Sequence, residues 1–253
     1  MKLLKNKDKE ILNIALPAIV ANITVPLLGL VDVAITGHLG NAAYIAAIAV
    51  GSMLFNVIYW VFGFLRMGTS GMTAQAYGRG DSAETMLLLM RGLCVALAVA
   101  LAVLVLQRPL LALAINVMGV EPSLQPLVRT YFQICVWGAP AMLCLYAFTG
   151  WFIGLQNTRI TMTVSIVQNI VNIMASLLLV YGLGMTIDGV ATGTLIAQWS
   201  GLLVAASYAY LKHRGLLKPL SLRAVTRGEA LMRFFNVNRD IFLRTLFLVA
   251  VNL

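Results

Sequence analysis

Six stretches of this 253-residue chain are predominantly apolar over more than 20 residues, and this repetition limits the fold more than any other feature. A helix needs about 20 such residues to cross the hydrocarbon core of a bilayer. Backbone polar groups inside lipid must be bonded within their own segment, which an α-helix achieves. The sequence therefore predicts an all-α, polytopic membrane protein with six transmembrane helices and the start of a seventh. The expected spans are 11–36, 44–67, 84–106, 128–152, 160–182 and 187–211, with the seventh beginning near residue 241.

The composition agrees with a surface that faces lipid. Hydrophobic residues make up 60% of the chain and charged residues only 11%, whereas a soluble domain carries about 25% charged residues. The net charge of +9 would also suit a nucleic-acid partner, but the basic residues lie between apolar runs and form no patch with interleaved aromatics. We therefore expect membrane lipid, and no nucleic acid, as a partner.

The basic residues also predict the orientation of the chain. If the N-terminus is cytoplasmic, sixteen of the 18 lysines and arginines fall on the cytoplasmic side, and only Arg108 and Arg129 fall outside. Loops on the cytoplasmic side of membrane proteins carry an excess of Lys and Arg. The distribution favours a multi-pass protein with a cytoplasmic N-terminus.

The connections between spans suggest a simple domain organisation. Residues 1–211 are expected to form a six-helix lobe, and 212–240 a basic cytoplasmic linker. Part of that linker, 220–235, suits an amphipathic helix attracted by anionic lipid. The outer connection, 107–127, is expected to begin with a short helix lying at the interface. Residues 241–253 are too short to cross a membrane, so we expect further chain to follow.

Asp32 is the most informative single position. It lies near the outer end of the first span, in VPLLGLVDVAITGHLG. A carboxylate at the centre of a membrane helix costs about 2.5–3.5 kcal/mol on insertion scales, and less toward the ends. Burial favours the protonated form of a carboxyl group, which suits proton uptake and release. Asp32 is therefore a candidate ion-coupling group; the alternative is an interfacial acid that reaches water.

The same span contains two prolines, Pro17 and Pro26. Proline removes a backbone hydrogen bond and clashes with the preceding turn, and membrane helices tolerate it where neighbours bond the freed groups. A bend that changes here would move Asp32 between environments, so both prolines are candidate hinges. The alternative is that they only shape helix packing.

The fifth span is unusually polar. Gln168, Asn169, Asn172 and Ser176 lie within SIVQNIVNIMAS, and the last three recur at i, i+3 and i+7, on one helix face. In the sixth span the hydroxyl of Thr194 is able to bond to another helix. We predict that Asn172, Ser176 and Thr194 take part in ion coupling and that Gln168 and Asn169 line a substrate cavity. The alternative is interhelical hydrogen bonding alone.

The sequence contains none of the common catalytic patterns: no GxSxG, HExxH, phosphate-binding loop or paired carboxylates on one helix. His38 and His213 are too few and too far apart for a zinc site. We expect neither an enzyme nor a bound cofactor or metal. The energy source is then an ion gradient or a partner.

Several stretches resemble the multidrug and toxic compound extrusion (MATE) exporters, particularly the DinF branch. The most specific is ALPAIVANITVPLLGLVDVAITGHLG, supported by RMGTSGMTAQAYGRGD and GWFIGLQNTR. The resemblance covers essentially the whole chain. It implies one lobe of a twelve-helix transporter, with a C-terminal lobe missing from this sequence. It also implies a bacterial inner membrane location and export of amphipathic or cationic drugs against inflow of H⁺ or Na⁺.

The resemblance also implies roles for single residues. The first-span acid of the family corresponds to Asp32 and its proline bend to Pro17, while its fifth-span asparagine and sixth-span hydroxyl correspond to Asn172 and Thr194. Members of this branch typically have an aspartate where this chain has Ser176. Hard cations prefer anionic oxygens, so we expect H⁺ as the coupling ion, with Na⁺ as the alternative.

Two rival functions remain at this stage. Related folds serve as flippases of lipid-linked precursors, which need a larger basic cavity than the neutral and acidic residues here suggest. A membrane scaffold or partner subunit without transport activity is the other alternative.

Overall fold

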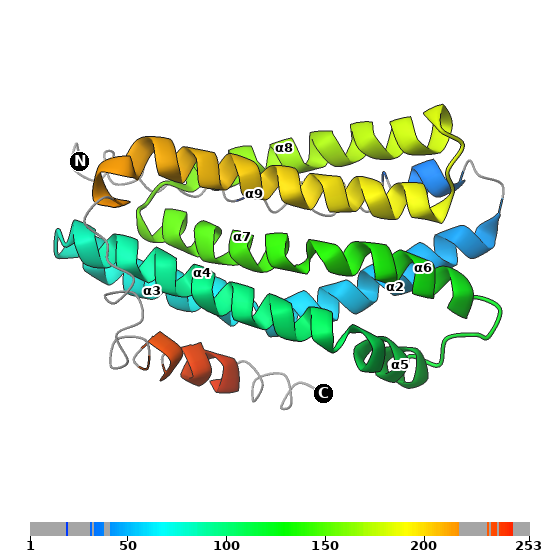
Figure 1. The fold of residues 1–253 in the computed structure, drawn as a ribbon, viewed down its shortest axis with the longest axis horizontal. Helices are drawn as coiled ribbons and strands as arrows, with labels where there is room; N and C mark the ends of the chain where they lie inside the picture. Colours follow the sequence, from blue (N-terminus) through cyan, green and yellow to red (C-terminus); the bar gives the residue numbers. More distant parts are fainter. Residues whose placement is uncertain are drawn as a thin grey trace, which may run out of the picture.

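The computed structural model describes residues 19, 31, 33–37, 41–217, 232, 234–236 and 238–244. Every regular element in this part of the chain is a helix (Figure 1). The helices are α2 (Ala42–Val61), α3 (Phe64–Gly78), α4 (Ser82–Val105), α5 (Gln107–Val117), α6 (Gln125–Cys135), α7 (Ala139–Gly154), α8 (Thr158–Leu177) and α9 (Ile187–Leu217). A 3₁₀ turn, Val136–Gly138, joins α6 to α7, and a π-helical turn, Leu178–Gly182, follows α8.

Five helical segments of the described residues are long and apolar enough to cross a membrane. They coincide with the second to sixth predicted spans, so the all-α, polytopic membrane fold is confirmed. Of the first predicted span, residues 19, 31 and 33–36 are described, all of them as helical. Of the expected seventh, residues 241–244 are helical.

Local capping explains where two of the spans begin. The Oδ1 atom of Asp81 accepts a hydrogen bond of 2.9 Å from the backbone N–H of Glu84, and Asn41 caps α2 in the same way through Ala43. Asp and Asn side chains are favoured at this position because they bond to N–H groups left free at a helix start. Both helices therefore begin two residues earlier than their apolar runs predict.

Two predicted spans are interrupted in the structure. The span expected over 44–67 is divided at Phe62 and Gly63 into α2 and α3. The span expected over 128–152 is divided by the 3₁₀ turn, with Pro140 in the first turn of α7. Proline lacks the N–H that would bond to the preceding turn, so the α-helical ladder is broken at that point.

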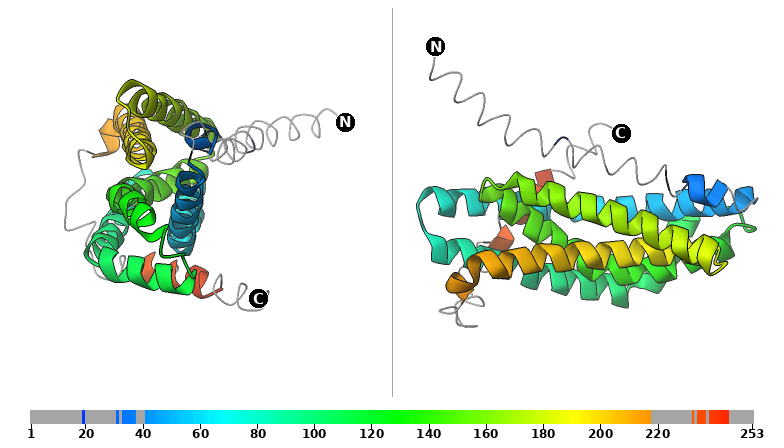
Figure 2. Two further views of the ribbon diagram at one scale, coloured as in Figure 1. Left: turned by 90° about the vertical axis from the view of Figure 1, so that its right-hand side faces the viewer. Right: turned by 90° about the horizontal axis from the view of Figure 1, so that it is seen from above.

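The paired helices α6 and α7 form the centre of the bundle. In the most apolar stretch of 18 residues within this segment, 61% is buried, compared with 33–39% in the corresponding stretches of the other four spans. Seen along the helices (Figure 2, left), α8 and α9 lie on one side of α7 and α3 and α4 on the other, with α2 at the flank. Lipid-facing side chains such as Leu101 and Leu203 remain more than 60% exposed.

Small residues bring neighbouring helices unusually close. Along α9, Gly189, Gly193, Ala197, Gly201 and Ala205 recur at every fourth position, and all five are buried. This stripe allows α8 to pack against the α9 backbone. On α7, Gly150 lies against the carbonyl oxygen of Arg66, where a Cβ atom would overlap it. Helix contacts in lipid depend on such close packing, because burial of apolar surface gives little driving force there.

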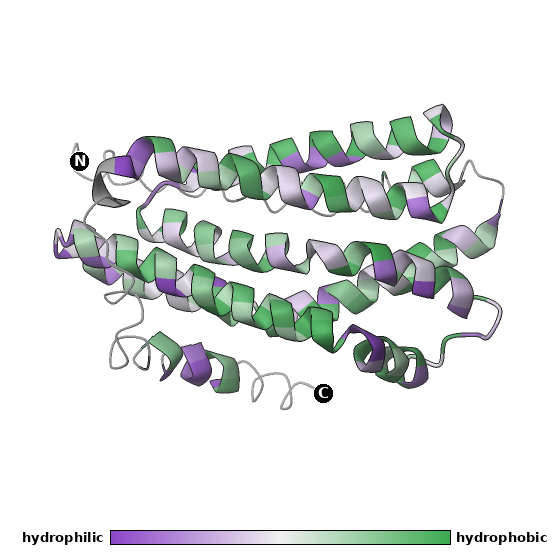
Figure 3. Ribbon diagram, in the orientation of Figure 1, coloured by the Kyte–Doolittle hydropathy of each residue, from purple (hydrophilic) through white to green (hydrophobic). Residues whose placement is uncertain are grey.

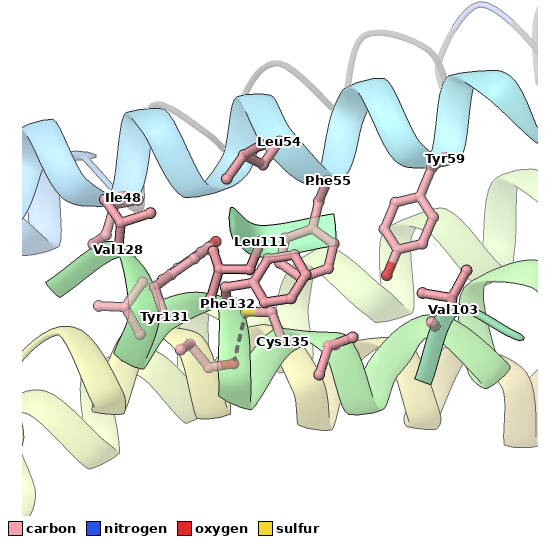
Figure 4. Packing of buried hydrophobic residues seen from close by; sticks show 14 of the residues in the cluster. Ile48, Leu54, Phe55, Tyr59, Val103, Leu111, Val128, Tyr131, Phe132 and Cys135 are labelled. Carbon is pink, nitrogen blue, oxygen red and sulfur yellow. Dashed lines mark hydrogen bonds between the residues drawn. The ribbon is translucent and has the colours of Figure 1, made fainter. Parts of the chain in front are cut away.

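Aromatic packing fills the space between α2 and α6 (Figure 4). The rings of Phe55 and Phe132 stack with centroids 5.0 Å apart, and the hydroxyl groups of Ser52 and Tyr131 lie 3.2 Å apart. The Tyr131 ring occupies the space that a Cβ on Gly51 would need. This cluster fixes α2 against the central helix pair.

Beyond α9 the chain packs back onto the bundle. The described residues between 232 and 244 are helical and lie along α3 and α4 (Figure 1). Phe234 is fully buried, Asn238 contacts Gly68, and the Phe64 and Phe242 rings meet edge to face with centroids 5.6 Å apart. α9 is kinked at His213, two residues beyond the lobe boundary predicted at residue 211, and ends at Leu217. The stretch between the expected lobes thus contributes helical residues that bury Phe234 and Asn238 against the bundle, while Met232, Phe235, Arg239 and Asp240 stay exposed.

Candidate functional site

A buried polar seam lies between α8 and α9, within the membrane-spanning part of the bundle. Gln168, Asn172 and Ser176 follow one another at intervals of four along α8, so they share a face. That face meets the small-residue stripe of α9: Ser176 lies against Gly193 and Gln168 against Gly201. Hydropathy colouring shows hydrophilic positions in the middle of α8, flanked by hydrophobic ones (Figure 3).

Asn172 connects the two helices. Its Nδ2 atom donates a hydrogen bond of 3.0 Å to the hydroxyl oxygen of Thr194, which in turn donates to the carbonyl oxygen of Val190 at 3.1 Å. Asn172, Ser176 and Thr194, which the sequence predicts to act together, are therefore brought to one place. Their role in ion coupling stays a prediction.

Two oxygen atoms of the seam lack a bonding partner among the described residues. They are Oδ1 of Asn172 and Oγ of Ser176, and both side chains are 0% exposed. A buried polar atom left without a hydrogen bond costs about 1–3 kcal/mol. Such atoms are rare in native structures and commonly mark a functional role or a bound species. The seam therefore offers an amide oxygen that accepts and a hydroxyl group that accepts or donates, neither with a formal charge, to a small ligand or to a polar group of another helix.

The remaining predicted site residues lie apart from this pair of oxygen atoms or outside the described part of the chain. Gln168 belongs to the seam but is only partly buried, and Asn169 is also partly buried. Asp32, Pro17 and Pro26 lie outside the described residues. The described helical residues near Asp32 do approach the end of α8, since the hydroxyl of Tyr181 donates to the carbonyl oxygen of Ile35 at 3.4 Å.

A second polar position, Gln198, carries no functional prediction from the sequence. Its Oε1 atom is buried without a partner among the described residues, and it occupies the place where a Cβ on Gly138 would lie. Gln198 lies about one helical turn after Thr194 along α9. The run Gly138-Ala139-Pro140 signals a break in the central helix, but only the fold reveals that a side chain of α9 fills it.

No group of three or more His, Cys, Asp or Glu side chains able to hold a metal ion occurs among the residues that the structure describes. The seam itself contributes only amide and hydroxyl oxygens from α8 and α9. Tight binding of a divalent ion needs carboxylate oxygens. The chemistry available to these described residues is hydrogen bonding to a protonated group or a weakly held cation.

We expect Thr194→Val to reduce stability by about 1 kcal/mol, because it removes the interhelical hydrogen bond of Asn172. Thermal unfolding in detergent measures the change. The matched control is Thr163→Val on the exposed face of α8, where the hydroxyl bonds only to the carbonyl oxygen of Arg159 in the same helix. Equal unfolding temperatures for the two variants would mean that the hydrogen bond between Asn172 and Thr194 contributes nothing to the stability of the fold.

Comparison with known proteins identifies the architecture. The sequence profile of the MatE family matches residues 17–178, well over half of the chain. The chain belongs to the MatE family. Proteins of this family are transporters, not enzymes.

The similarity of this MatE chain extends over nearly all of its length. It is 37% identical over 250 residues to the DNA damage-inducible protein F of Escherichia coli (strain K12). The aligned region covers 98% of this chain and 54% of that protein. A probable multidrug resistance protein NorM of Acinetobacter baylyi is 28% identical over 207 residues, covering 80% and 45%. The MatE chain thus spans about half the length of the curated relatives it matches, as expected for an N-terminal lobe.

Solved structures support the same architecture. A crystal structure of MATE in the straight conformation superposes with a TM-score of 0.81 at 20% identity, covering 94% of this chain and 53% of that one. At this identity the agreement concerns the fold alone. It shows that the MatE chain has the fold of about half of that larger chain.

Proposed function

We propose that this MatE lobe belongs to an ion-coupled antiporter that exports amphipathic or cationic organic compounds. The names of its relatives, among them multidrug resistance proteins, support this substrate class. We place the protein in a bacterial inner membrane with its N-terminus in the cytoplasm, as the distribution of basic residues suggests.

The observation that carries this proposal is the pair of buried oxygen atoms without a hydrogen-bond partner in the α8–α9 seam. Asn172 Oδ1 and Ser176 Oγ lie inside a membrane-spanning helix pair, where unbonded polar atoms are unfavourable. A structural role accounts for the Nδ2 atom of Asn172, which bonds to Thr194, but not for the two free oxygens. A donor that arrives only in one state of the transport cycle would satisfy them.

In this mechanism Asp32 is the proton-binding group. Protonation removes the charge whose burial is unfavourable, and a neutral carboxyl group becomes a hydrogen-bond donor. It is then able to donate a hydrogen bond to Asn172 Oδ1, an amide oxygen that only accepts and that repels the ionised form. In this mechanism Pro17 and Pro26 act as hinges that allow the first helix to change its position with this exchange. Proton binding and substrate binding thereby exclude one another.

Two features favour H⁺ over Na⁺ and export over flipping of lipid-linked precursors. The seam supplies no carboxylate from α8 or α9, because Ser176 stands where related proteins typically have aspartate, and neutral oxygens hold Na⁺ weakly. The described seam also has no basic side chain to hold a precursor's phosphates.

The coupling ion is tested in vesicles that contain the purified protein and a fluorescent cationic dye. An imposed proton gradient is expected to drive dye transport, whereas a sodium gradient of equal size at constant pH is not. Transport driven only by sodium would overturn the choice of ion. Transport driven by neither gradient would overturn the antiporter.

Ser176→Asp is expected to make transport responsive to Na⁺. The new carboxylate would lie beside Asn172 Oδ1 and Thr194, where it completes an anionic set of oxygens for a hard cation. Ser165→Asp on the same helix, outside this stretch, is the matched control. The measurement is dye efflux against external sodium concentration at fixed pH. An identical lack of response in both variants would contradict the assignment of Ser176 to the ion pathway.

A further inference from the structure

A groove of about 190 Å³ lies between α4 and α9, over the central helix α7. Its floor consists of Met86 and Leu89 from α4, Phe148 from α7 and Ala209 from α9, each no more than 6% exposed. Every residue lining the groove is apolar except Tyr210, which is 60% exposed and stands at the rim. The groove belongs neither to the α8–α9 seam nor to the expected substrate cavity.

The groove exists because α9 presents small side chains at this level. Ala206 and Ala209 end at Cβ, so α9 places no bulk toward α4 there. In the end-on view (Figure 2, left), α4 and α9 lie on the side of the bundle opposite α2. The opening therefore lies on a flank of the bundle, and in a membrane protein such an apolar opening faces lipid.

Along the membrane normal, the groove lies near one end of the spans. Met86 is four residues from the start of α4 at Ser82, and Tyr210 is four residues before Arg214, the last residue of the apolar α9 segment. The first interval is about 6 Å along the axis of α4, and the second crosses the kink of α9 at His213. The groove thus begins just inside the level where headgroups give way to acyl chains, a depth where Tyr side chains are enriched.

This end of the bundle is the basic one. Among the described residues, Arg79, Arg159, Lys212 and Arg214 are exposed there. Of the two acidic residues nearby, Glu84 forms an ion pair of 2.8 Å with the buried Arg91, which leaves Asp81. At the opposite end Arg108 and Arg129 are balanced by Glu121 and Asp188. The charge at this end of the bundle therefore attracts anions and repels cationic drugs, and Arg214 is the basic residue that lies one helical turn from Tyr210 in the sequence.

We propose that the groove binds an acyl chain of an anionic phospholipid, whose phosphate lies beside Arg214. The apolar floor accommodates methylene groups, Tyr210 stands at the level of the glycerol, and the basic end of α9 faces the headgroup. This inference does not depend on the proposed transport function, because it concerns only the lipid-facing flank of the lobe.

Lipid retention tests the proposal. The purified protein is equilibrated with equimolar phosphatidylglycerol and phosphatidylcholine, delipidated with mild detergent and analysed by native mass spectrometry. We expect retained phosphatidylglycerol to exceed phosphatidylcholine by about fivefold, the ratio that one basic residue near a membrane surface provides. Arg214→Ala is expected to bring the ratio to about one, while Arg159→Ala at the same end is expected to leave it unchanged.

A second pair of variants tests the groove itself. Ala206→Trp fills the groove and is expected to remove one retained phosphatidylglycerol per protein. Ala206→Leu, which adds a smaller side chain, takes its place if the tryptophan impairs folding. Leu203→Trp, at a position 64% exposed outside the groove, is expected to retain the lipid. Equal retention in the Ala206 and Leu203 variants would overturn the proposal. So would an unchanged lipid ratio in Arg214→Ala, or a change in oligomeric mass on filling the groove, which would assign it to a second copy.

Discussion

Asp32→Asn is expected to reduce export of a cationic dye to the rate of protein-free vesicles. Asparagine has nearly the same shape as aspartate but binds no proton in the relevant pH range, so the step that couples proton inflow to release of substrate is lost. The measurement is dye efflux under an imposed proton gradient, with the amount of inserted protein determined for each preparation.

Asp188→Asn is the matched control for this experiment. Asp188 is another acidic residue of the lobe, and its carboxylate accepts hydrogen bonds from the N–H and hydroxyl of Thr186 at the start of α9. It takes no part in the proposed coupling, so its variant is expected to transport at close to the normal rate. Normal transport by Asp32→Asn would refute proton coupling through this residue.

The largest effect on stability is expected for Gly150→Ala. A Cβ atom at this position would overlap the carbonyl oxygen of Arg66 and lie 3.1 Å from Cβ of Thr69. Because a backbone atom is in the way, α3 and α7 must separate, which costs about 1–3 kcal/mol. Each kcal/mol corresponds to about 2–4 °C in Tm for a protein of this size. We therefore expect a loss of several degrees in a thermal unfolding experiment.

The control for Gly150→Ala is Gly71→Ala in α3. Gly71 has no heavy atom within 4 Å of its ideal Cβ position. The substitution is expected to raise stability by about 0.4–1 kcal/mol, since alanine restricts the unfolded chain more than glycine does. If both variants unfolded at the same temperature, close packing of α3 on α7 would not be what holds these helices together.

The sequence alone predicts the positions of the second to sixth spans well, because the length of an apolar run is decided by the bilayer and not by tertiary contacts. It predicts the breaks less well. The interruption at residues 136–138 is signalled by Gly138 and Pro140, but a proline within a membrane helix is also compatible with an unbroken span. Whether the helix breaks depends on what fills the gap, here the side chain of Gln198.

The polar face of α8 illustrates a similar limit. Periodicity correctly brings Asn172 and Ser176 to one face, but it does not distinguish spacing of three from spacing of four, and the structure places Gln168 with them against α9. In the stretch after α9 the basic residues favour a cytoplasmic linker, which stays a prediction, and no charge pattern indicates that Phe234 and Asn238 are buried against α3 and α4. The α4–α9 groove depends on three helices at once, so no local pattern predicts it.

Proton release on substrate binding tests the central claim most directly. The purified protein is placed in weakly buffered detergent solution with a pH-sensitive dye, slightly below neutral pH, and a saturating amount of a cationic substrate is added. The account predicts that binding releases protons from the normal protein and none from Asp32→Asn. Substrate binding without any change in proton occupancy would contradict an exchange of proton for substrate in this lobe.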